Sequence, residues 1–196
     1  MIAIRIVAVV LALSLSGCIG RQAKFAPVGT HDILSTDQIE AEWPLEWMTL
    51  RPAEKDEEAN KEGILLWLSR DGFTIQTMLL TKRRVEAEFK HTRKKLSAGM
   101  LPQEAAEVVL DNVRANPDAV DFRIIENAPA TLVGAPGFKL SFTYRGNSGL
   151  QRQSVLYGCL DKGMLVTLSL DAPKRHYFQK DLLALEKVKA TLRWIS

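Results

Sequence analysis

The residue types that most often carry out chemistry are few and widely spaced in this sequence. The histidines His31, His91 and His176 form no HxH, HxxxH or HExxH pattern, so we expect no metal site. Ser169, Asp171 and His176 fall within eight residues, as a triad would require. They straddle the start of an expected helix, however, where Asp171 suits the N-cap position. The sequence therefore predicts a protein that is not an enzyme and holds no cofactor.

A glycine-flanked serine is the remaining candidate nucleophile. Gly146-Asn-Ser-Gly149 differs from the Gly-x-Ser-x-Gly turn that joins a strand to a helix in hydrolases. It also lies between two expected strands. We interpret it as a hairpin loop.

The first seventeen residues have the pattern of a secretory signal. Arg5 is the one charged side chain among them, and residues 6–15 form an uncharged apolar run. A membrane-spanning helix needs about 20 apolar residues, roughly twice this length. We therefore expect residues 1–17 to be a signal peptide.

The motif at the end of this signal sharpens the prediction. Leu15-Ser-Gly-Cys18 resembles the lipobox of bacterial lipoproteins. The resemblance implies cleavage before Cys18, a diacylglyceryl group on its thiol and a further acyl chain, such as palmitate, on the new amine. Each buried CH₂ contributes about 0.8 kcal/mol, so several chains anchor a protein stably. Ile19, in place of Asp, implies the outer membrane facing the periplasm if the host is Gram-negative. The alternative is an ordinary secretory signal that happens to contain a cysteine.

Removal of the signal leaves a chain of single-domain size. We expect a lipidated N-terminus and tether over residues 18–42, and one domain over residues 43–196. The mature formal charge, 25 − 23 = +2, argues against nucleic acid as a partner. Lipidation of Cys18 leaves Cys159 without an intramolecular disulfide partner. We expect Cys159 to be a small buried apolar residue, the alternative being a reactive thiol.

Apolar periodicity predicts an α+β domain, in which an antiparallel sheet of about six strands is flanked by helices. Asp71-Gly72 is suited to a hairpin turn. Pro102 suits the first turn of a helix, and Asn116-Pro117 its end. The expected helices span residues 101–116 and 171–193. The expected strands span residues 63–68, 73–80, 120–125, 137–144, 151–160 and 164–170.

The most basic stretch of the sequence is residues 82–95, where eight of fourteen residues are Lys, Arg or His and two are Glu. One hypothesis is a patch for anionic partners such as lipid headgroups. The alternative is a solvated loop or helix rim. The candidate patch residues are Arg83, Arg84, Lys90, Arg93, Lys94 and Lys95.

Several short strings together resemble an uncharacterised group of proteobacterial lipoproteins with a Mog1/PsbP-like domain. This resemblance implies an α/β/α sandwich and a role as a binding or assembly factor. We therefore expect a non-catalytic envelope lipoprotein that binds another envelope protein. The alternative is a binder of a lipid, an amphiphile or an anionic envelope component, through residues 82–95 or a pocket under the C-terminal helix. The strings are Met100-Leu-Pro-Gln-Glu, Pro136-Gly-Phe138, Tyr144, Tyr157-Gly158 and Ala172-Pro173 followed by His176-Tyr-Phe178.

Overall fold

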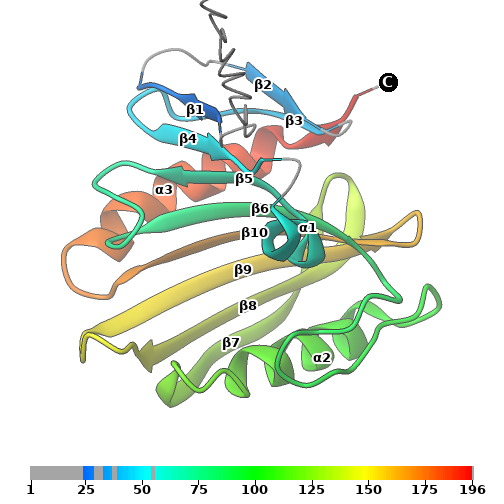
Figure 1. The fold of residues 1–196 in the computed structure, drawn as a ribbon. Helices are drawn as coiled ribbons and strands as arrows, with labels where there is room; N and C mark the ends of the chain where they lie inside the picture. The colour runs from blue at the N-terminus through cyan, green and yellow to red at the C-terminus, as the bar shows by residue number, and fades with distance from the viewer. Residues whose placement is uncertain (1–23, 29–32, 37–38, 54–55, 196) are drawn as a thin grey trace, which may run out of the picture.

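The computed structural model describes residues 24–28, 33–36, 39–53 and 56–195. The expected signal peptide and Cys18 lie outside this part of the chain. The described residues form an eight-stranded antiparallel sheet, a small three-stranded sheet and three helices (Figure 1). No helix among these residues is long and apolar enough to cross a membrane.

The eight strands of the main sheet are, in spatial order, β1 (Lys24–Ala26), β4 (Met48–Arg51), β5 (Ile64–Ser69), β6 (Thr77–Arg84), β10 (Met164–Pro173), β9 (Gln151–Asp161), β8 (Ala135–Arg145) and β7 (Val120–Leu132). The small sheet has the order β11 (Arg193–Trp194), β3 (Ile39–Glu42) and β2 (Ile33–Thr36).

Two-residue turns set the register of the long hairpins. Val133 and Gly134 join β7 to β8 with φ of 47° and 79°, and Lys162 and Gly163 join β9 to β10 with φ of 50° and 72°. Positive φ at both positions is the geometry of type I′ turns, whose twist matches that of the flanking strands. The strand pairs β7–β8 and β9–β10 are accordingly antiparallel and adjacent.

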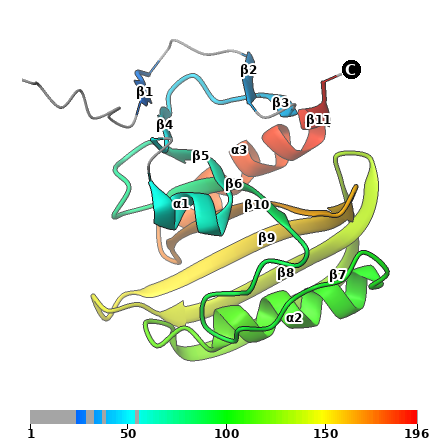
Figure 2. The same cartoon turned by 45° about the vertical axis from the view of Figure 1, so that its right-hand side comes forward.

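Helices cover the two faces of the main sheet. Helix α3 (Tyr177–Thr191) lies on one face and buries Phe178, Leu185 and Val188. Helices α1 (Glu57–Glu62) and α2 (Pro102–Arg114) lie on the opposite face, as both views show (Figure 2). Each face therefore has its own apolar core, one under α3 and one under α2.

The predicted α+β class is confirmed, but the sheet is larger than the six strands expected. The additional strands include β1 and β4, which are too short to give a periodic pattern. Three strands, β1 to β3, also lie within residues 18–42, the expected tether. Ile39 and Ala41 of β3 are buried, so part of this segment belongs to the packed domain.

The closing helix begins later than the sequence predicted. Asp171 was expected to be its N-cap, but β10 continues to Pro173 and α3 begins at Tyr177. The prediction of this N-cap is wrong because Asp171 pairs with Ser154 of β9 and Thr77 of β6 in the sheet. The predicted strand 73–80 likewise begins only at Thr77.

Candidate binding sites

The basic stretch lies at the end of β6 and in the loop that follows it, opposite α1. Between them is a hollow with a volume of about 770 Å³. We call it the charged groove. Its lining includes Glu57, Glu58 and Glu62 from α1, and Glu88, Lys90 and Arg93 from the loop.

The predicted patch residues are paired with carboxylates. Lys90 Nζ lies 2.5 Å from Glu58 Oε1, so the loop is tied to α1 by this pair. The shared hydrogen bond raises the pKa of Lys90 and lowers the pKa of Glu58. The stretch is therefore less positive than its composition indicates. The remaining pairs are Arg83–Glu62, Arg84–Glu86, Arg93–Glu88, Lys94–Asp111 and Lys95–Glu88.

Arg83 differs from the other patch residues because it is buried, with 7% of its side chain exposed. Its guanidinium donates to the carbonyls of Ala87 and Glu88, at 3.2 and 2.7 Å, and lies 4.3 Å from the centre of the Phe89 ring. Burial lowers the pKa of Arg83, and Glu62 acts in the opposite direction. Arg83 therefore holds the loop in place and has little surface left for a partner.

A smaller hollow of about 290 Å³ lies beside α3, the helix under which the sequence predicted a possible pocket. Trp43 and Pro44 line one side, and Lys180 and Leu183 of α3 line the other. Arg70 lies at this hollow as well, where its guanidinium is 5.8 Å from the centre of the Trp47 ring.

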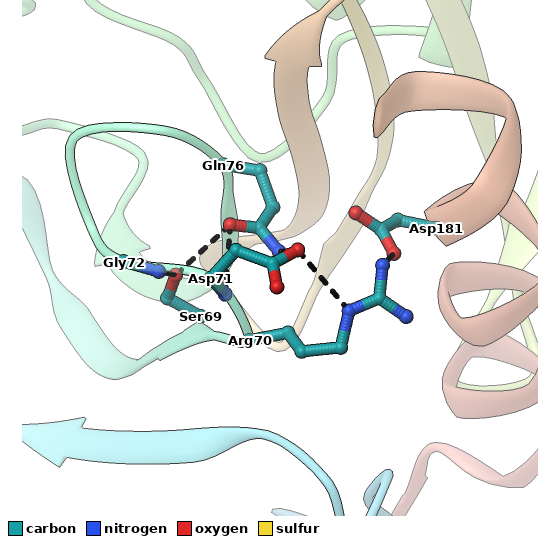
Figure 3. Close-up of polar contacts among 6 residues, drawn as sticks. All are labelled: Ser69, Arg70, Asp71, Gly72, Gln76 and Asp181. Carbon is teal, nitrogen blue, oxygen red and sulfur yellow. Dashed lines mark hydrogen bonds and ion pairs between the residues drawn. The ribbon is translucent and has the colours of Figure 1, made fainter. Parts of the chain in front are cut away.

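An ion pair beside this hollow ties the β5–β6 connection to α3. Figure 3 shows Arg70 reaching from the end of β5 to Asp181 of α3, with which its guanidinium pairs. Arg70 Nε is also 3.3 Å from Asp71, which accepts a hydrogen bond from Gln76. Asp181 is fully buried. Burial raises the pKa of Asp181, and the charge of Arg70 opposes this shift.

A second polar cluster lies on the sheet around Asp171. Its carboxylate accepts hydrogen bonds from Tyr144, Arg152 and Ser154, the first over 2.8 Å. Burial, followed by the charge of Asp171, raises the pKa of Tyr144. Asp171 was the carboxylate of the Ser169, Asp171 and His176 triad considered from the sequence, and these hydrogen bonds occupy it. The ring of His176 packs edge-on against Tyr177.

Cys159 is fully buried in the core under α3, as the sequence led us to expect. Burial, with a contribution from the charge of Asp161, raises the pKa of its thiol to about 12. The thiolate is the reactive form, so burial and the raised pKa both disfavour reaction of Cys159 at neutral pH. Among the described residues, no group of three or more His, Cys, Asp and Glu side chains is arranged to hold a metal ion.

These features define a single-layer antiparallel sheet covered by helices on both faces, and solved structures share it. Cyanobacterial PsbP from Synechocystis is similar with a TM-score of 0.55 at 12% identity, over 93% of this chain and 98% of that one. LpqN of Mycobacterium tuberculosis, described as involved in cell envelope biogenesis, has a TM-score of 0.54 at 14% identity, over 89% and 92%. The predicted PsbP-like fold is thereby confirmed.

A more distant structure is the Ran-binding protein Mog1p of Saccharomyces cerevisiae, with a TM-score of 0.45 at 9% identity over 89% of this chain and 96% of that one. No protein-family model matches the sequence, and no curated protein matches it.

Proposed function

We propose that this protein is an outer-membrane lipoprotein that faces the periplasm and binds another envelope protein, as an assembly factor rather than an enzyme. The anchoring rests on Leu15-Ser-Gly-Cys18. The fold is compatible with this role, because it is shared with LpqN, for which cell envelope biogenesis is named.

The observation that carries the binding role is the mixture of charges in the charged groove. Four glutamates and six basic residues line it, and the pairs Lys90–Glu58 and Arg93–Glu88 are exposed to solvent. Exposed ion pairs contribute little to stability, about 0 to 1 kcal/mol, so they exchange partners at low cost. A partner protein whose surface carries both signs of charge can therefore form ion pairs with these residues in place of the internal pairs.

A second candidate follows from the excess of basic over acidic residues in the same groove. This excess favours an anionic envelope component, such as a phospholipid headgroup, which would use Arg84, Lys90 and Arg93. Such a ligand would also meet the carboxylates of Glu58 and Glu88. This repulsion is why we place the protein partner first.

The test is photo-crosslinking in cells from a residue at the groove. A photoreactive amino acid in place of Arg84, whose side chain is 80% exposed, should capture a specific envelope protein. The matched control is the same group at Arg145, which is 59% exposed at the far end of β8. Capture of the same proteins at both positions, or of none at Arg84, would contradict the proposal.

Charge reversal separates the two candidates. We expect Lys90→Glu to reduce capture of the partner, and the double variant Glu58→Lys/Lys90→Glu to remain defective although its internal pair is restored. Both residues are exposed, so thermal stability should hardly change. If the single variant leaves capture intact but, in a Cys18→Ser form without the lipid, abolishes binding to vesicles containing phosphatidylglycerol, the anionic component is the ligand.

A further inference from the structure

A row of large apolar side chains crosses the half of the main sheet that contains β1, β4, β5 and β6. Phe25 pairs with Leu50, Leu50 with Trp67, and Trp67 with Leu79 in the register of the four strands. Residues directly opposite each other in an antiparallel pair point to the same face of the sheet. We call these four residues the apolar row.

The apolar row points away from α3. Its neighbours Leu68 of β5 and Met78 of β6 are fully buried in the core under α3. Successive residues of a strand point to opposite faces, so Trp67 and Leu79 lie on the other side. The row thus shares a face with α1 and α2 without being part of the core under α2.

Helices α1 and α2 leave the apolar row partly exposed to solvent. Helix α2 packs on β7, β8 and β9, on the far half of the sheet (Figure 1). Helix α1 meets β6 at Lys82, where Gly63 accepts a backbone hydrogen bond over 2.7 Å. Phe25 is 59% exposed, and Leu50, Trp67 and Leu79 are partly exposed.

A neighbouring side chain enlarges this apolar surface. The ring of Phe73 packs edge-on against Trp67, with 5.7 Å between the ring centres. Exposed apolar groups that gather on one face commonly mark contacts with proteins or membranes.

The position of Cys18 decides between these partners. Only residues 19–23 separate it from β1. Six residue steps span at most about 20 Å when fully extended. The headgroup region on each side of the hydrocarbon core is about 5 to 8 Å thick. A lipid on Cys18 therefore holds Phe25 close to the surface of the bilayer.

We propose that the apolar row lies against the bilayer that holds the lipid on Cys18, with Phe25 entering the interface. This inference rests on the anchoring in the proposed function. It means that the sheet, and not the lipid alone, orients the domain, with α3 directed away from the membrane. The hollow beside α3 is then open to the periplasm, whereas the charged groove, which is lined by α1, lies on the side of the membrane surface.

The test measures how fast an introduced thiol reacts with a charged maleimide. The mature lipidated chain carries Phe25→Cys or, as the matched control, Leu183→Cys, which lies on α3 and is 72% exposed. The thiol of Cys18 is blocked by lipid and Cys159 is buried, so the maleimide labels only the introduced cysteine. Rates are compared between vesicles of phosphatidylethanolamine and phosphatidylglycerol and the Cys18→Ser form without vesicles.

We expect the vesicles to slow labelling of Phe25→Cys about tenfold, equivalent to about 1.4 kcal/mol in favour of the docked state. Labelling of Leu183→Cys should change less than about twofold, because α3 faces away from the membrane. A second measurement keeps Phe25 intact. Lipids brominated in their acyl chains should quench the fluorescence of the wild type more than that of Trp67→Phe.

Flotation of the vesicles separates the possible failures. A mature protein that does not float would overturn both the anchoring and this inference. Flotation with equal labelling rates in the two states, and no quenching that depends on Trp67, would overturn this inference alone. Protection of Phe25→Cys without vesicles that increases with protein concentration would show a second copy on the face, and would also overturn it.

Discussion

Replacement of Arg70 by Met is expected to lower the free energy of unfolding by about 3 kcal/mol, because it leaves a buried carboxylate without its partner. Asp181 is fully buried, and the guanidinium of Arg70 pairs with it. The side chain of Arg70 is 18% exposed, so we take the lower end of the range known for broken buried pairs. Urea unfolding followed by circular dichroism measures the change.

The loss of stability in Arg70→Met should decrease as the pH falls. Burial raises the pKa of Asp181 in the folded protein, and Arg70 opposes this shift. Without Arg70 the folded pKa rises further, so ionised Asp181 costs stability at neutral pH. A protonated carboxyl carries no such cost, and the cost is absent below the unfolded pKa of about 3.9. The deficit of Arg70→Met should therefore be largest near neutral pH and shrink as pH falls.

The double variant Arg70→Met/Asp181→Leu is the control for this interpretation. It removes both charges, so we expect it to be more stable than Arg70→Met alone at neutral pH. A deficit of Arg70→Met that stays constant with pH and persists in the double variant would mean that packing against Trp47, rather than charge, is responsible.

Replacement of Gly158 by Ala is expected to destabilise the protein by about 2 kcal/mol through overpacking. An added Cβ would lie 2.4 Å from Cζ of Phe138, whose ring covers this glycine from the adjacent strand β8. Phe138 is 2% exposed in the core under α2, so its ring can move only by disturbing that core. Thermal unfolding of the wild type and of Gly158→Ala measures the change in stability.

Gly99→Ala is the matched control, because an added Cβ at Gly99 meets no atom within 4 Å. We expect its unfolding free energy to stay within about 0.5 kcal/mol of the wild type. A Gly158→Ala protein as stable as Gly99→Ala would show that the ring of Phe138 is not confined as the packing implies.

The parts of the fold that the sequence revealed are those governed by local patterns. The turn around Gly163 and the long strands on either side of it follow from turn chemistry and alternation. The strands β1 and β4 have no such local signal, since their pairing partner lies more than twenty residues away in the sequence. Asp171 was misplaced because an Asp two residues before a proline resembles an N-cap, while its three hydrogen-bond donors come from two other strands.

The candidate binding sites show the same division between local patterns and contacts that are distant in the sequence. The run of basic residues at 82–95 is visible in the sequence, but Glu58, which pairs with Lys90, lies 32 residues from it along the chain. The pair of Arg70 and Asp181 spans 111 residues, so no spacing rule predicts it. Burial of Arg83 follows from the loop that folds over it. The proposed lipobox, Leu15-Ser-Gly-Cys18, is by contrast a contiguous motif, so the sequence alone suggests it.

The chemical state of the mature N-terminus decides whether the protein is anchored by a lipid on Cys18 as proposed. The decisive measurement is mass spectrometry of the N-terminal peptide of the protein extracted from membranes. We predict a peptide that begins at Cys18 and carries the mass of a diacylglyceryl group, with a further acyl chain on its amine. A peptide that begins at another residue, or an unmodified Cys18, would contradict the account.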